Sequence, residues 1–148
     1  MEDKNCKQTE EILSEIYRNA QLALQSISNI LPQVEDEEVR QALSSQHEEY
    51  EKFSSKATML AKDLGVELKE PNPFKKAMMW GSIKMSTMKD NSRAHIAEMM
   101  VQGTVMGITA LRASLGELPE DGNEEIVALL KEMIETEETF EKRWKAYI

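Results

Sequence analysis

The sequence predicts a single all-α domain, and three observations lead to this fold class. The chain has 148 residues, of which 41% are hydrophobic and 30% are charged, a composition typical of one globular domain. Only six Gly and four Pro are present, too few for the many turns of a β-sandwich or for a low-complexity chain. Apolar residues recur every three or four positions over long segments, which is the period of an amphipathic helix.

Charge and cysteine content exclude several classes of function. A formal net charge of -9 would repel phosphate backbones and so disfavours nucleic acid as a partner. Cys6 is the single cysteine, which excludes an internal disulfide and a cysteine-based zinc site. The N-terminal sequence has no apolar signal segment, so we expect a cytoplasmic protein. Residues 1–8 are predicted to be a disordered tail in front of a helical domain at 9–148.

Two long helices are expected in the first half of the chain. Thr9 is predicted to cap a helix over 10–31, which Pro32 follows. A second helix is predicted over 36–64, with Gly65 placed to form a left-handed cap. The apolar stripe of the second helix alternates steps of four and three, as in helices packed at shallow angles: Val39, Leu43, Gln46, Tyr50, Phe53, Ala57, Leu60 and Leu64.

Three further helices follow. An Asn-Pro pair at 72–73 predicts the start of a short helix over 74–89, because proline suits the first helical position. Polar residues at 90–92 are expected to cap a fourth helix that ends near Leu115. A fifth helix is predicted from Glu124 to the C-terminus.

The long connection between the two helical hairpins predicts the topology. It spans 27 residues, from Gly65 to Asn91. It offers about 24 Å of helix plus about 36 Å of extended chain, against about 43 Å for the second helix. The chain can therefore return along the full length of a bundle. We expect a four-helix bundle in which the second and third long helices run parallel.

One polar residue on each long helix falls in or beside the apolar seam: Asn19, Gln46, Gln102 and Glu137. In the parallel arrangement all four lie about 15–18 Å from the end at which the first hairpin turns. Burying such groups without partners costs a few kcal/mol each. We therefore predict a hydrogen-bonded cluster, a water site or a metal site at this level.

Two long hairpins, a long crossover and inward polar residues at mid-bundle resemble the ferritin-like superfamily, over residues 9–148. The resemblance implies a ferritin-like four-helix bundle whose crossover contains a short fifth helix. In metal-binding members it also implies a Glu on the first and third long helices and a Glu-x-x-His on the second and fourth. This chain departs from that pattern, since Ser44 and Ser92 stand three residues before His47 and His95. Three of the four layer residues are amides, so we interpret the layer as a neutralised descendant of a di-metal site.

A divergent iron or manganese site is the alternative interpretation. Glu98 lies in the stretch 96–111, which is apolar nearly all round, and a carboxylate there is expected to be paired or coordinated. The candidate metal ligands are Glu98, Glu137, Glu49 and His47. Against this alternative, glutamates in these helices are also expected to face water. A histidine close to such a glutamate is then expected to form a solvent-exposed side-chain pair with it, without a metal.

Seven of the ten methionines lie between residues 78 and 106. Within 74–89 a stripe of Phe74, Met78, Gly81, Met85 and Met88 accompanies four lysines and no acidic residue. Four interpretations are open: packing against the apolar fourth helix, a dimer or protein-partner surface over 74–111, contact with a membrane surface, and a soft-metal thioether site. The shortness of the segment and the acidity of the remaining chain disfavour the membrane.

No phosphate-binding glycine loop, nucleophile elbow, His-Glu-x-x-His motif or EF-hand spacing occurs in the sequence. We expect a non-catalytic, homo-oligomeric ferritin-like bundle without a cofactor, with a structural or partner-binding role. The alternative is an iron- or manganese-binding protein or oxidase of the same fold. The sequence leaves open whether the chain is an enzyme.

Overall fold

The computed structural model describes residues 2–119 and 121–148. These residues form helices and loops and contain no β-strand. The helices are α1 (Glu2–Ile30), the short 3-10 helix η1 (Leu31–Gln33), α2 (Glu37–Leu64), α3 (Pro73–Lys89), α4 (Arg93–Glu117) and α5 (Glu124–Lys145). The prediction of an all-α chain is confirmed. None of the described helices is both long enough and apolar enough to span a membrane.

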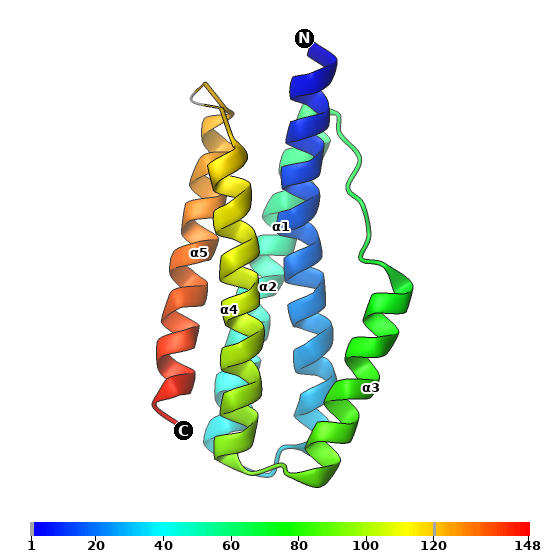
Figure 1. Cartoon of the computed structure of the whole chain (residues 1–148). Helices are drawn as coiled ribbons and strands as arrows, with labels where there is room; N and C mark the ends of the chain where they lie inside the picture. The colour runs from blue at the N-terminus through cyan, green and yellow to red at the C-terminus, as the bar shows by residue number, and fades with distance from the viewer. Residues whose placement is uncertain (1, 120) are drawn as a thin grey trace.

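The path of the chain is simple (Figure 1). Helix α1 descends, α2 rises, the chain returns through an extended strap at residues 65–72 and through α3, then α4 rises and α5 descends. Helices α2 and α4 consequently point in the same direction. Neighbouring long helices are antiparallel: α1 contacts α2 and α4, and α5 contacts the same two helices from the other side.

Side-chain caps set most helix boundaries. Asp36 accepts a hydrogen bond from the Val39 backbone N–H at 3.2 Å, which satisfies one free donor at the start of α2. Asn72, Ser92 and Asn123 cap α3, α4 and α5 in the same way. Gly65 ends α2 at φ 67°, a left-handed conformation that favours glycine. These boundaries agree with the prediction to within about a residue.

Three predicted boundaries are wrong: the start of α1, the end of α4, and the end of α5, which lies at Lys145 and not at the C-terminus. Helix α1 begins at Glu2 and runs through Thr9, so Thr9 is not a cap and the backbone of residues 2–8 is helical where a disordered tail was expected. Glu, Lys and Gln are good helix formers, and nothing in this polar segment breaks a helix. Helix α4 continues to Glu117, past the predicted end at Leu115.

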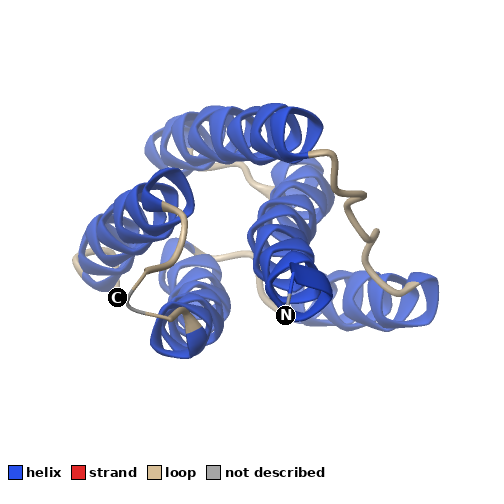
Figure 2. Cartoon of the chain, turned by 90° about the horizontal axis from the view of Figure 1, so that it is seen from above, coloured by secondary structure: helices blue, strands red, loops and turns tan. Residues whose placement is uncertain are grey.

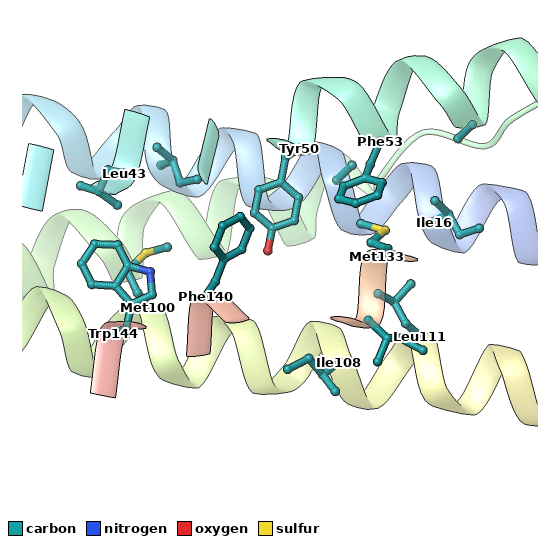
Figure 3. Close-up of a cluster of buried hydrophobic side chains, with 14 of the residues drawn as sticks. Ile16, Leu43, Tyr50, Phe53, Met100, Ile108, Leu111, Met133, Phe140 and Trp144 are labelled. Carbon is teal, nitrogen blue, oxygen red and sulfur yellow. The ribbon is translucent and has the colours of Figure 1, made fainter. Parts of the chain in front are cut away.

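The four long helices share one apolar core. Its largest fully buried side chains include Trp144, Phe53, Leu43 and Ile16. The rings of Tyr50 and Phe140 lie side by side at a centroid distance of 5.9 Å, tilted by 48° (Figure 3). Such tilted aromatic pairs add stability beyond the area they bury.

The short helix α3 packs against α1 and not along the outer face of α4, where it was expected (Figure 2). Its buried residues are Ile83 and Thr87, and Met79 contacts Ser26 of α1 with 3.3 Å between sulfur and hydroxyl oxygen. Helix α3 meets α4 at the start of that helix, where Ser86 Oγ lies 2.7 Å from His95 Nε2. The outer face of α4 is therefore not covered by the crossover.

Candidate functional site

A buried carboxyl group lies at the centre of the molecule. Glu137 of α5 is fully buried, and its Oε1 accepts a 3.1 Å hydrogen bond from the hydroxyl of Tyr50 of α2. Figure 3 shows this hydroxyl directed from α2 into the interior. The other oxygen of Glu137, Oε2, has no hydrogen-bond partner among the described residues. A buried polar atom without a partner is uncommon and marks this position for attention.

Gly107 of α4 and Asn19 of α1 complete the surroundings of Glu137. A Cβ atom at Gly107 would lie 2.8 Å from Glu137 Oε2 and 3.0 Å from Asn19 Oδ1, so the glycine makes room for both side chains. Asn19 Nδ2 donates to the Gly107 carbonyl oxygen at 3.4 Å. We call Asn19, Tyr50, Gly107 and Glu137 the central polar cluster. Its members come from all four long helices.

Burial controls the protonation of this cluster. It raises the pKa of Glu137 to about 8, although the hydrogen bond from Tyr50 and the nearby Asn19 amide act in the opposite direction. Burial, followed by the nearby Glu137 carboxyl, also raises the pKa of Tyr50 well above its usual value. At neutral pH both groups therefore stay uncharged, and the interior holds no free charge at this level.

A second polar contact lies near the cluster. Gln46 of α2 is buried, and its Oε1 accepts a 2.6 Å hydrogen bond from Nε1 of the fully buried Trp144. An indole N–H in an apolar core needs an acceptor, and Gln46 supplies it. Gln46 therefore has a structural role, because its side-chain oxygen is bonded to the Trp144 indole.

The predicted layer is partly wrong. Gln46 and Glu137 are buried and Asn19 is half-buried, but Gln102 is exposed. Gly107 is the α4 residue that faces Glu137. Helix α4 is apolar on most sides, so its residues do not indicate clearly which face turns inward.

The four predicted metal ligands are not brought together. Glu137 is buried, whereas Glu98 is exposed, contrary to the expectation that it needs a buried partner. His47 Nδ1 lies 2.7 Å from Glu51 Oε1 on the same helix, and Glu49 pairs with Lys52 at 3.1 Å. Within residues 2–119 and 121–148 no three His, Cys, Asp or Glu side chains are grouped so as to hold a metal ion.

The chemistry of the central polar cluster does not fit a pair of iron or manganese ions. Such ions need several carboxylates and imidazoles converging on one point. The cluster offers one carboxyl group, one amide, one phenol and one backbone carbonyl. The neutral amide and phenol are weak ligands, and one carboxyl group is fewer than the several carboxylates that such a pair of ions needs. We therefore assign no metal chemistry to this cluster.

Three residues of the interior were missed as polar partners. Tyr50 and Trp144 lie on predicted apolar stripes, four residues after Gln46 and seven after Glu137. Both share a helix face with a buried polar residue, and a buried hydroxyl or indole N–H requires a hydrogen-bond partner. This shared position could have predicted that they bond to polar side chains in the interior. The sequence held no such signal for Gly107, whose role depends on a side chain from another helix.

Two apolar surfaces within the predicted partner segment 74–111 are open. On α3 the side chains of Phe74, Met78, Met85 and Met88 are 62–73% exposed. Together with Gly81 we call them the α3 ridge. On α4, Val105 is 39% and Met106 72% exposed.

The surroundings of these two surfaces differ in charge. Lysines stand beside the α3 ridge, whereas charges of both signs stand beside the α4 surface: Glu98 and Arg112 on α4, and Glu138 of α5, which pairs with Arg112. Comparison of the chain with known protein families, with curated proteins and with solved structures finds no match.

Proposed function

We propose that this chain is a divergent ferritin-like four-helix bundle of the cytoplasm that acts as a non-catalytic homo-oligomer. Its interior would be the descendant of a di-metal centre in which hydrogen bonding has replaced metal ligation. The observation that carries the proposal is Glu137, a single buried carboxyl group that is protonated at neutral pH and bonded to Tyr50.

Helix directions support the ferritin-like part of the proposal. The first hairpin is α1 and α2, the second is α4 and α5, and the crossover between them makes α2 and α4 parallel. Ferritin-like bundles have one long crossover of this kind. The pairs of long helices with the closest packing, α1 with α2 and α4, and α5 with the same two helices, are antiparallel, which brings unlike helix-dipole ends together.

The outer face of α4 supports self-association. Five exposed residues recur on this face at steps of three and four: Glu98, Gln102, Val105, Thr109 and Arg112. The exposed Met106 stands beside them. Glu98 and Arg112 each lie seven residues from Val105, on opposite sides. An antiparallel pairing of two copies about Val105 would place Glu98 opposite the partner's Arg112, and the two-fold axis would make this contact twice. Unlike charges then meet around an apolar centre.

A charge swap tests this pairing. Glu98→Arg should weaken the dimer about tenfold or more, because the introduced guanidinium would face the partner's Arg112 at two symmetric places. Arg112→Glu should do the same and also breaks the ion pair of Arg112 with Glu138 within the same chain, and the double exchange should restore association between chains. Glu48→Arg, at an exposed position of α2, is the matched control. Analytical ultracentrifugation over a concentration series gives the dissociation constants. A protein that stays monomeric at every concentration contradicts the proposal.

Metal loading tests the other half of the proposal. Protein incubated with Fe(II) or Mn(II) and then desalted should retain no stoichiometric metal, and its melting temperature should not change. Tight retention of metal that is lost in Glu137→Ala would instead favour an iron or manganese protein.

A further inference from the structure

The α3 ridge is an exposed apolar strip on the outside of the bundle. Its members Phe74, Met78, Gly81, Met85 and Met88 alternate steps of four and three, which aligns them along one side of the helix. At 100° per residue this side lies opposite the buried Ile83. Large apolar side chains that are this exposed and lie together on one short helix indicate a binding surface.

The charge around the ridge is positive, in contrast to the rest of the molecule. Helix α3 contains four lysines and no acidic residue. The remaining chain has 14 basic and 27 acidic residues, a net charge of -13. Residues 19–34, which include the part of α1 that carries Ser26 beside α3, contain no charged residue at all. Helix α3 and the neighbouring segment of α1 therefore carry positive charge only, and the acids Glu70 and Asp90 lie just beyond the two ends of α3.

Three of the four lysines border the strip, and the fourth, Lys76, lies on the opposite side of the helix, near Ile83. By helical position Lys75 and Lys89 lie on one edge of the ridge and Lys84 on the other. Lys84 Nζ also stands 4.9 Å from the centre of the half-exposed Trp80 ring. Basic side chains along both edges of an apolar strip, with a tryptophan beside it, are typical of a helix that lies in a lipid interface.

We propose that the α3 ridge docks on an anionic lipid surface. Phe74 and the three methionines would enter the boundary between headgroups and acyl chains, and the flanking lysines would meet lipid phosphates. Helix α3 would lie flat on the surface without crossing the bilayer. This inference goes beyond the proposed function and does not depend on it.

Two features favour lipid over a protein partner. The apolar side chains of the ridge are 62–73% exposed, whereas protein interfaces gain most of their energy from anchors seated in pockets. Two open surface hollows, one around Arg112 and Glu138 and the other around Gln8 and Lys69, are not lined by the α3 ridge. An antiparallel pairing of the ridge with a second copy would also bring Lys75 near the partner's Lys89. This contact between like charges would disfavour the pairing.

The acidity of the whole chain does not oppose this docking. Helices α4 and α5 lie on the other side of α1 from α3 (Figure 2). Charges separated by more than a Debye length, about 8–10 Å at physiological salt, are largely screened. The lysines of α3 therefore act on a nearby anionic surface more strongly than the acids of α4 and α5 do.

Vesicle binding tests the inference directly. The probes are vesicles of phosphatidylglycerol and phosphatidylcholine in equal parts, and vesicles of phosphatidylcholine alone. We expect co-sedimentation with the first and not with the second, weakening as salt rises. Trp80 should report docking by a blue shift of its fluorescence, because the other tryptophan, Trp144, is already fully buried. Absence of binding to the anionic vesicles would overturn the inference.

Matched variants separate the ridge from general electrostatics. Lys75→Gln, Lys84→Gln and Lys89→Gln together should weaken binding about a hundredfold, at roughly fivefold per lysine. The same change of charge at Lys131, Lys142 and Lys145 of α5 should have little effect. Equal losses in both triple variants would contradict a specific role of the ridge.

Loss of the apolar strip gives a second readout. Met78→Ser with Met85→Ser should abolish the blue shift while leaving the helical circular dichroism unchanged, since both side chains are exposed. Vesicle binding that survives this double change would count against insertion of the ridge. A blue shift produced by polyglutamate and by no vesicle would assign the face to an acidic protein instead. Self-association lost in the same double variant, without vesicle binding, would assign it to a second copy.

Discussion

The hydroxyl of Tyr50 donates a 3.1 Å hydrogen bond to Glu137, and both side chains are buried between α2 and α5. This contact joins the two hairpins, because α2 belongs to the first hairpin and α5 to the second. A tyrosine can donate one hydrogen bond, and a buried carboxyl group gains most from such a donor. The pair therefore fixes the position of α5 against α2 while leaving Oε2 of Glu137 unpaired.

The protonation of Glu137 makes stability depend on pH. Its pKa is 4.5 as a free group and about 8 in the folded protein, so between these values the folded state holds a proton that the unfolded state has released. Stability from this group is complete below pH 4.5 and decreases by up to about 1.4 kcal/mol per pH unit as the pH rises towards 8.

Glu137→Gln removes this titration. The variant should gain stability relative to the native chain as the pH rises from about 5 to about 8, because glutamine carries no charge in either state. Urea unfolding across this range measures the difference. Parallel stability profiles of the two proteins would show that Glu137 is not protonated in the folded state.

Gly107→Ala should destabilise the fold by about 1–3 kcal/mol, because the new Cβ would lie 2.8 Å from Glu137 Oε2. Gly103→Ala is the control on the same helix, since open space surrounds its Cβ position. That change should stabilise by about 0.5–1 kcal/mol through helix propensity alone. Thermal unfolding of both variants provides the comparison, and equal effects would argue against the close approach at Gly107.

Gln46→Leu should cost about 1–3 kcal/mol, because the Trp144 indole N–H would lose its acceptor in a dry core. A double-mutant cycle with Trp144→Phe should show a coupling of about 0.5–3 kcal/mol. From the sequence we expected Gln46 to depend on Glu137, but the structure gives it Trp144 as its partner. A second double-mutant cycle combines Gln46→Leu with Glu137→Gln. The stability changes of these two substitutions should add more closely than those of Gln46→Leu and Trp144→Phe.

Asp36 has two roles that can be separated. It caps α2 through Val39 and forms an ion pair with Arg93 Nε at 2.7 Å, and both contacts lower the pKa of its carboxyl group. Asp36→Asn should keep the cap and lose only the exposed ion pair, so the midpoint of unfolding should change little. Asp36→Ala should lower this midpoint further, because the cap is lost as well. Chemical unfolding of the two variants distinguishes the contributions, and identical losses would mean that the cap is unimportant.

The sequence was sufficient where a local signal decides the structure. The caps at Asp36, Asn72 and Ser92 and the left-handed Gly65 follow from the chemistry of single residues and their immediate neighbours. The stripe of α2 placed Gln46 and Tyr50 in the core because polar residues on its other faces fix its orientation. Helix α4 lacks such a contrast between faces. The prediction therefore placed Gln102 and Glu98 in the interior, whereas both are exposed.

By itself the sequence determined the all-α class, most helix boundaries, and the presence of Glu137 and Gln46 in the interior. Tertiary structure alone decided which face of α4 is buried, that Gly107 opposes Glu137, that Gln46 bonds to Trp144, and that α3 rests on α1 with its methionines exposed. The physical reason is the range of the forces involved. Caps and helical periodicity act within a few residues, whereas the partner of a buried polar atom is set by helices distant in sequence that pack against it.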